Sequence, residues 1–209
     1  MESPIAMKLL FDSDAFCKLA IGGVLDDTIS LFGVDLSECG RLPALPHMLR
    51  RGRLRTVYGP EACDALVPIS EAVPVLIQAQ ESWLDRLTQV VAVDPGEAQI
   101  FAVAAELSLL VVSGDKRALR VLKDVVGYPQ ALKGRIAVLE AVLVALCDRL
   151  GSNEVRNRLQ PMLASDVMIS VCFSEGNIDP CEGLWSYYNQ LASDLSPLEL
   201  WHPHLGGLE

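Results

Sequence analysis

Residues 94–116 constrain the fold of this 209-residue chain more than any other stretch. The segment begins with Asp94-Pro95-Gly96-Glu97, where a capping aspartate, a proline at the first helical position and a glutamate three residues after the cap predict a helix start. Apolar residues then recur at helical spacing. Residues 109–112 form a short, partly β-branched apolar run, and Asp115 follows soon after it. This order is typical of a helix followed by a central strand of a parallel sheet.

The N-terminal part repeats this arrangement on a smaller scale. Residues 8–11 lead apolar side chains into Asp12-Ser13-Asp14, and a helical pattern follows. If both strands are neighbours in one parallel sheet, we expect Asp12, Asp14 and Asp115 at its carboxyl edge, where open α/β sheets bind their ligands. Glu97, at the head of a helix in the same fold, is expected to reach that edge.

The predicted elements follow the order strand, helices, strand, helix, strand, helix, strand, which indicates an α/β fold with a doubly wound sheet. Residues 90–93 and 125–126 are expected to be short strands in this series. Beyond residue 128 the pattern is mostly helical, and residues 136–150 predict a buried helix. We therefore divide the chain into an α/β domain at residues 1–128 and a helical C-terminal extension at residues 129–209 that packs on it.

Composition limits the classes of function. The formal net charge of −10 argues against a general nucleic-acid coat protein, because phosphate binding needs clustered positive charge, but it allows an enzyme that contacts few phosphates. The longest central apolar run, residues 136–147, is interrupted by Glu140 and is shorter than the roughly 20 residues that a bilayer requires. The N-terminus has no signal-peptide pattern, and the six cysteines form no CxxC pair. We expect a cytoplasmic protein with reduced thiols and no membrane segment.

Arginines gather in one place in this acidic chain, at Arg41 and between residues 50 and 55. One interpretation is a solvated surface loop that offsets nearby acids. The other is a contact with a phosphate backbone, because the arginine fork binds phosphate oxygens through two hydrogen bonds. Under the second interpretation the nucleic-acid-binding residues are Arg50, Arg51, Arg53 and Arg55.

The acids of the predicted sheet edge have two explanations. Singly, Asp14 and Asp115 are suitable helix caps, and Asp94 with Glu97 can form a capping box, each cap contributing about 1 kcal/mol. Gathered at one edge, carboxylates repel each other, and a bound cation makes such a cluster tolerable. Carboxylate oxygens without histidine or cysteine favour Mg²⁺ or Mn²⁺ over zinc. Such an ion activates water and neutralises charge on a phosphate, which indicates metal-dependent hydrolysis of a phosphodiester.

These motifs resemble those of the PIN-domain nucleases, over roughly residues 7–128. The similar segments are the apolar strand into Asp12-Ser13-Asp14, the Gly96-Glu97-Ala98 helix opening and the strand that ends in Ser113-Gly114-Asp115. Asp12, Glu97 and Asp115 match the acids of the family in order, and Ser113 matches its small hydroxyl residue. The resemblance implies that these four residues are catalytic, and that Asp12, Glu97 and Asp115, with Asp14 beside them, hold the metal.

The resemblance also implies a three-layer α/β/α fold with a central parallel sheet, Mg²⁺ or Mn²⁺ as cofactor and cleavage of single-stranded RNA. A toxin-like role would add a protein inhibitor or a second copy of the chain as partner. The sequence departs from the family in one respect, because residues 42–49 lack the acid that the family usually carries after its second strand. Glu61 and Asp64 are the available substitutes in a displaced helix.

Two alternatives stay open. The missing acid and the negative charge favour a PIN-like binding module that has lost catalysis. The Asp12-Ser13-Asp14 segment also resembles the strand and D-x-D motif of haloacid-dehalogenase phosphohydrolases, which implies that Asp12 is a nucleophile and Asp14 a general acid. Phe16 and Leu119 depart from the pattern of that second family.

Overall fold

The computed structural model describes residues 7–204, apart from the side chain of Glu81. Its centre is a sheet of parallel strands in the order β2-β1-β3-β4. The strands are β1 (Leu9–Phe11), β2 (Cys39–Gly40), β3 (Leu110–Ser113) and β4 (Ile136–Val138). All their side chains are buried, as expected for parallel strands that are covered on both faces. The structure confirms the predicted α/β fold with a central parallel sheet.

Helices make every connection between the strands. The path from β1 to β2 contains α1 (Ser13–Ile21), α2 (Leu25–Leu31) and the 3-10 helix η1 (Leu36–Glu38). The path from β2 to β3 contains α3 (Leu45–Arg51), α4 (Arg53–Tyr58), α5 (Pro60–Ala72), α6 (Glu81–Thr88) and α7 (Pro95–Leu107). The path from β3 to β4 contains α8 (Lys116–Leu122) and α9 (Tyr128–Ala131).

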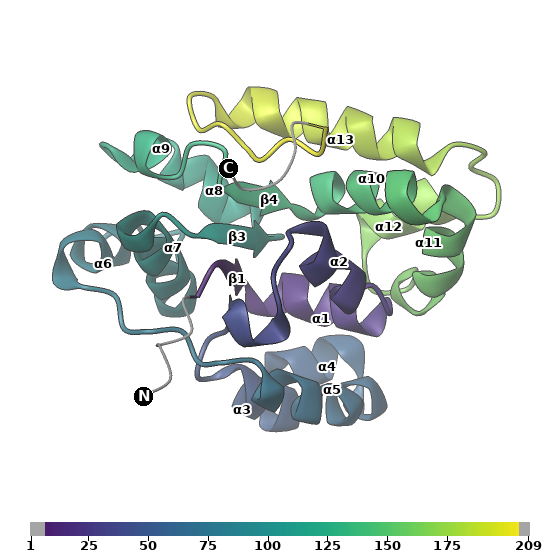
Figure 1. The fold of residues 1–209 in the computed structure, drawn as a ribbon, viewed down its shortest axis with the longest axis horizontal. Helices are drawn as coiled ribbons and strands as arrows, with labels where there is room; N and C mark the ends of the chain where they lie inside the picture. The colour runs from purple at the N-terminus through teal and green to yellow at the C-terminus, as the bar shows by residue number, and fades with distance from the viewer. Residues whose placement is uncertain (1–6, 205–209) are drawn as a thin grey trace.

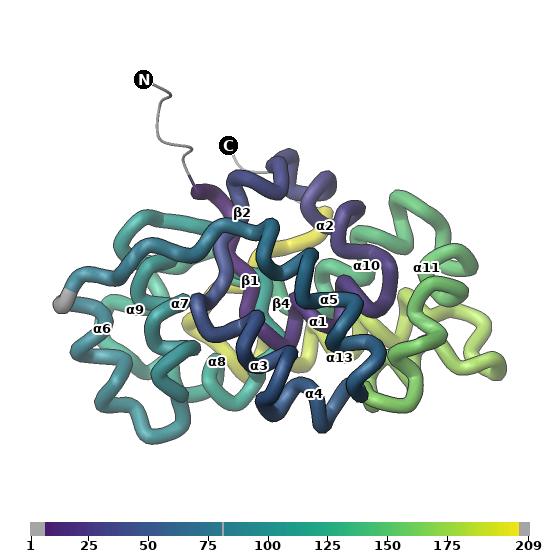
Figure 2. The backbone as a smooth tube through the Cα atoms, turned by 90° about the horizontal axis from the view of Figure 1, so that it is seen from below, coloured from purple at the N-terminus to yellow at the C-terminus, as the bar shows by residue number. Residues whose placement is uncertain are grey.

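The C-terminal region continues directly from the sheet. Its elements are α10 (Leu139–Leu150), α11 (Ser152–Arg158), the 3-10 helix η2 (Gln160–Met162), α12 (Val167–Phe173) and α13 (Pro180–Leu195). In Figure 1, α10 and α13 lie on one side of the strands, and α3, α4 and α5 lie on the other, beyond α1. Figure 2 shows α3 to α5 in front of α1 and β1, with α6 and α7 at one end of the molecule and α11 at the other.

Three sequence-based expectations about strands are wrong. Residues 90–93 form a turn after α6, where Val91 is fully exposed, and residues 125–126 form a turn before α9, where Val126 is also exposed. Neither segment pairs with a strand, so only Val93 of their valines is buried. In contrast, residues 136–138 are strand β4 and not the start of a helix. A short buried strand and a buried helix give the same continuous apolar signal, which explains this error.

Strand β4 changes the relation between the two predicted parts of the chain. It pairs with β3 although the sequence places residues 136–138 in the helical extension, so the sheet does not end at residue 128. Helix α10 follows it without a break, and residues 139–147 are all buried. The outer edges of the sheet are covered by other segments: Arg41 bridges to Val75 beside β2, and the Trp201 amide donates to the Ile136 carbonyl beside β4 (2.8 Å).

Within residues 7–204, no helix is long and apolar enough to cross a membrane. The cysteines are free thiols, and all except the half-buried Cys181 are buried.

Candidate functional site

A cavity of about 690 Å³ opens at the carboxyl ends of β1 and β3. Acidic side chains from three separate segments line it, namely Asp12 and Asp14, Asp94 and Glu97, and Asp115. Arg53 and Lys116 add positive charge, and the apolar lining includes Leu42, Met48, Leu54, Val57 and Ile100. The structure therefore brings all the predicted acids to one place, because parallel strands end at the same edge of the sheet.

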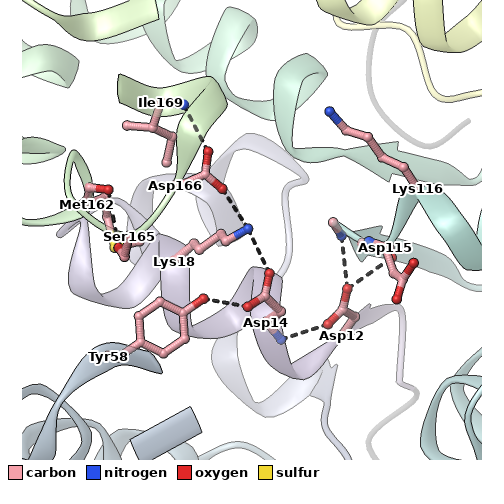
Figure 3. Close-up of polar contacts among 12 residues, drawn as sticks. Asp12, Asp14, Lys18, Tyr58, Asp115, Lys116, Met162, Ser165, Asp166 and Ile169 are labelled. Atoms are coloured by element: carbon pink, nitrogen blue, oxygen red, sulfur yellow. Dashed lines mark hydrogen bonds and ion pairs between the residues drawn. The ribbon is translucent and has the colours of Figure 1, made fainter. Parts of the chain in front are cut away.

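Asp12 is the buried centre of this site. It follows β1, and its amide donates to the Val112 carbonyl at the end of β3 (3.0 Å). Its Oδ1 caps α1 by accepting from the Asp14 amide (2.7 Å), and its Oδ2 accepts from the Ser113 hydroxyl (3.0 Å) and the Gly114 amide (2.9 Å) (Figure 3). Burial raises the pKa of Asp12, and the nearby Asp14 charge adds to this, although the hydrogen bonds oppose it.

Ser113 stands behind Asp12 and is not among the described residues that line the cavity. Its hydroxyl donates to Asp12, and its oxygen also accepts from the Asp115 amide (3.2 Å). The side chain is buried at 1% exposure, so it cannot reach a ligand directly. The hydroxyl holds the ends of β1 and β3 together, and it orients the Asp12 carboxylate while it accepts from the Asp115 backbone.

Asp14 faces the cavity, but donors already hold both of its oxygens. The Tyr58 hydroxyl donates to Oδ1, and the Lys18 ammonium lies 2.7 Å from Oδ2 (Figure 3). The same ammonium lies 2.7 Å from Asp166 Oδ2 in the C-terminal region. Burial lowers the pKa of Lys18, but attraction and hydrogen bonding to the two carboxylates outweigh it and raise the pKa. Lys18 is therefore a permanent cation between two anions.

Glu97 and Asp115 form a second acidic pair. Asp94 and Glu97 make the predicted capping box, in which the Asp94 amide donates to Glu97 Oε2 (3.0 Å) and the Glu97 amide donates to Asp94 Oδ1 (2.9 Å). Burial, and then a hydrogen bond with Asp115, raises the pKa of Glu97 to about 8. The pKa of Asp115 is lowered, because hydrogen bonds from Glu97 and from the Ala118 amide outweigh its burial. The two carboxyl groups share a proton at neutral pH.

The donor chemistry of the cavity fits a hard divalent cation, because carboxylate oxygens line it and no histidine or cysteine does so among the described residues. Within residues 7–204, however, no group of three or more histidine, cysteine, aspartate or glutamate side chains already has the spacing of a metal site. Glu97 and Asp115 converge, whereas Asp12 directs its oxygens to Ser113, Gly114 and Asp14.

The arginine cluster divides into residues with different surroundings. Arg53 lines the cavity, and its neighbour Arg51 is exposed outside it. Arg50 is paired with Glu71, and Arg55 is paired with Asp64. The side chain of Arg41 is buried and donates to the backbone carbonyls of Ser70 and Leu42. Most of the cluster therefore stabilises α3, α4 and α5, and Arg53 is the arginine placed beside the acids.

The acids considered as substitutes for the missing family acid do not reach the site. Neither Glu61 nor Asp64 is among the described residues that line the cavity, and Asp64 is occupied by Arg55. Sequence reasoning also missed Lys18, Tyr58 and Asp166. Lys18 carried a weak signal as a charged residue four positions after Asp14 in an apolar helix, but the other two lie too far away in the chain to give one.

Comparisons with known proteins add no relative: no protein-family model matches this chain, and searches of curated proteins and of solved structures found no match. The site is therefore interpreted from its own geometry and chemistry.

Proposed function

We propose that the chain is a metal-dependent ribonuclease of the PIN type, which hydrolyses phosphodiester bonds of single-stranded RNA. One observation carries the proposal: acids from three distant segments line a single cavity at the carboxyl edge of a parallel sheet. Gathering carboxylates is unfavourable without a cation, and burial, with a smaller contribution from the neighbouring acids, raises the pKa of Glu97. The order of the motifs along the chain supports the same family, as does the sheet with helices on both sides.

Asp12, Glu97 and Asp115 are the residues that would hold Mg²⁺ or Mn²⁺. When bound, such an ion activates water and offsets the charge that develops on a phosphate. Ser113 and Gly114 orient the Asp12 carboxylate through their hydrogen bonds. We assign Asp14 to the support of this group, because Tyr58 and Lys18 already hold both of its oxygens.

The remaining lining suits an unpaired nucleotide. Arg53 is placed to bind phosphate oxygens beside the acids, whereas the ammonium of Lys116 is already paired with Glu140. Met48, Leu42 and Val57 give the cavity an apolar wall, against which the face of a base can pack. A base within a duplex is stacked and paired, so a wall of this kind favours single strands.

The test combines metal binding with cleavage. Mn²⁺ at about 100 times its Kd is expected to add about 2.7 kcal/mol of stability, which raises the Tm by several degrees. Asp12→Asn keeps the size and capping ability of the side chain but removes its charge, and it should abolish both the Tm rise and the cleavage of a single-stranded RNA. Asp26→Asn, at an exposed position on α2, removes the same charge elsewhere and should change neither. Full cleavage by Asp12→Asn would refute the proposal.

The metal-free binding module is a second candidate, favoured by the lack of a three-ligand group within residues 7–204. It predicts RNA binding that is independent of Mn²⁺ and no cleavage by the wild-type protein. The phosphohydrolase alternative is disfavoured by Asp14, because the Tyr58 hydroxyl and the Lys18 ammonium already hold the two oxygens that a general acid would direct at a leaving group.

A further inference from the structure

We propose that the C-terminal helical region supplies a positioning residue for the site, Asp166, which fixes Asp14 and Asp12 through Lys18. The inference deepens the proposed function and rests on it, because the carboxylates that are positioned are those assigned to RNA cleavage. It gives the C-terminal region a role within the site.

The first step is the bridge itself. Lys18 Nζ lies 2.7 Å from Asp14 Oδ2 and 2.7 Å from Asp166 Oδ2, so one ammonium joins α1 to the N-cap of α12 (Figure 3). The side chains of Lys18 and Asp166 are only 14% and 11% exposed. A pair shielded to this extent is screened far less by salt than a surface ion pair. Asp166 also accepts from the Ile169 amide (2.9 Å), which fixes its own orientation.

The second step leads from Asp14 to Asp12 by two routes. The Asp14 amide donates to Asp12 Oδ1 (2.7 Å), so a shift of the first turn of α1 moves a donor of the central carboxylate. The ion pair also packs against Gly114: a Cβ at this position would lie 3.6 Å from Asp14 Oδ2 and 4.0 Å from Lys18 Nζ. The Gly114 amide is another donor to Asp12. Both routes lead from Lys18 to the Asp12 carboxylate, one through Oδ1 and the other through Oδ2.

The third step is the charge balance. Lys18 neutralises one of the two carboxylates that it contacts, so the bridge carries a net negative charge next to a site that already contains several acids. Without the Asp166 charge, the ammonium is held from one side only and can turn toward the cavity acids. A cation that enters the cavity in this way competes with a metal ion for the same carboxylates.

A parallel contact shows the same construction on the other side of the cavity. Lys116 lines the cavity, and its ammonium is paired with Glu140, a buried residue in the first turn of α10. The same ammonium lies over the Tyr187 ring of α13, 5.5 Å from its centroid. The C-terminal region thus contacts Lys116 directly through Glu140, and it contacts Asp14 indirectly through Lys18.

The main variant is Asp166→Asn, because asparagine caps a helix as well as aspartate does and α12 keeps its start. Lys18→Gln removes the bridging charge and carries the same test if the first variant does not fold. The control is Asp27→Asn, which breaks a comparable ion pair (2.7 Å) between α2 and Arg158 of α11. That pair also joins the N-terminal half to the C-terminal region, but neither residue lines the cavity.

The kinetic experiment measures cleavage of a single-stranded RNA over a range of Mn²⁺ concentrations. Asp166→Asn is expected to weaken Mn²⁺ binding and lower kcat by about tenfold with KM for RNA unchanged, as for residues that orient a metal ligand. Asp27→Asn should lower the Tm without either change. If Asp166→Asn keeps the wild-type kcat and Mn²⁺ affinity, the positioning role is overturned. It is also overturned if Asp166→Asn and Asp27→Asn lower kcat and Mn²⁺ affinity equally.

A second measurement keeps this inference separate from the proposed function. Two-dimensional amide NMR spectra of the metal-free protein report the environment of Asp14 and Gly114 whether or not the protein cleaves RNA. Asp166→Asn should shift both amide signals, and Asp27→Asn should leave them in place. A wild-type protein without Mn²⁺ binding or cleavage would refute the ribonuclease proposal, whereas unshifted Asp14 and Gly114 signals would refute the positioning.

Discussion

The carboxyl groups of Glu97 and Asp115 are hydrogen-bonded to each other in the candidate site, although they stand at the starts of two different helices. Two carboxyl groups form such a bond only when one of them keeps its proton. Glu97 is the proton carrier, since its pKa is raised to about 8, and Asp115 is the acceptor, since its pKa is lowered. In the absence of a cation, this shared proton relieves part of the repulsion between the cavity acids.

The first prediction concerns how the free energy of unfolding of the chelator-treated protein depends on pH. The raised pKa of Glu97 stabilises the fold fully below about pH 4.5, and this contribution is lost as pH rises toward about 8. Glu97→Gln replaces the shared proton with a permanent amide donor, so its free energy of unfolding should fall less across that window. After allowance for partial exposure, we expect a difference on the order of 2 kcal/mol. Urea denaturation at several pH values measures it.

The control for that series is Glu175→Gln, which removes a carboxylate from an exposed loop position. Its stability should follow the wild-type pH profile. A Glu97→Gln profile that is parallel to the wild type between pH 5 and roughly 8 would contradict the shared proton.

The second prediction concerns the serine behind Asp12. Ser113→Ala removes the donor to Asp12 and the acceptor for the Asp115 amide, and it leaves both partners in a poorly hydrated place. Loss of such a buried, charge-assisted hydrogen bond should cost about 1–3 kcal/mol in the free energy of unfolding. Ser70→Ala is the matched control, because Ser70 is equally buried but donates only to the Val67 carbonyl of its own helix. Equal losses in the two variants would argue against a special role of Ser113.

Local signals account for the part of this structure that the sequence predicts. The cap and proline at residues 94–95 start α7 where expected, and the apolar run before Ser113 forms β3. The acids meet in one cavity because the topology of a parallel sheet brings its carboxyl ends together. No such rule predicts the ion pair between Lys18 and Asp166, because it depends on where the N-cap of α12 lies relative to α1 in the folded protein. Likewise, whether residues 136–138 pair as a strand depends on the free edge of β3, which is a property of the folded sheet.

The third prediction separates two neighbouring arginines. Arg53 lines the cavity, whereas Arg51 is exposed outside it. Arg53→Ala should therefore weaken the binding of a labelled single-stranded RNA several-fold and reduce the slope of log K against log salt by about 1. Arg51→Ala should leave both quantities unchanged. Fluorescence anisotropy in EDTA between low and moderate salt measures binding without cleavage, and equal effects of the two substitutions would indicate general surface attraction.

The fourth prediction tests the support of Asp14 from the side opposite Lys18. Tyr58→Phe removes the hydroxyl that donates to Asp14 Oδ1 and keeps the half-buried ring in place. Because this hydrogen bond has a charged acceptor but is only partly shielded, its loss should lower the free energy of unfolding by about 1–2 kcal/mol. Tyr187→Phe is the control, since the Tyr187 ring contacts Lys116 through its face, which phenylalanine retains. Urea denaturation compares the two, and an unchanged stability of Tyr58→Phe would show that Lys18 alone fixes Asp14.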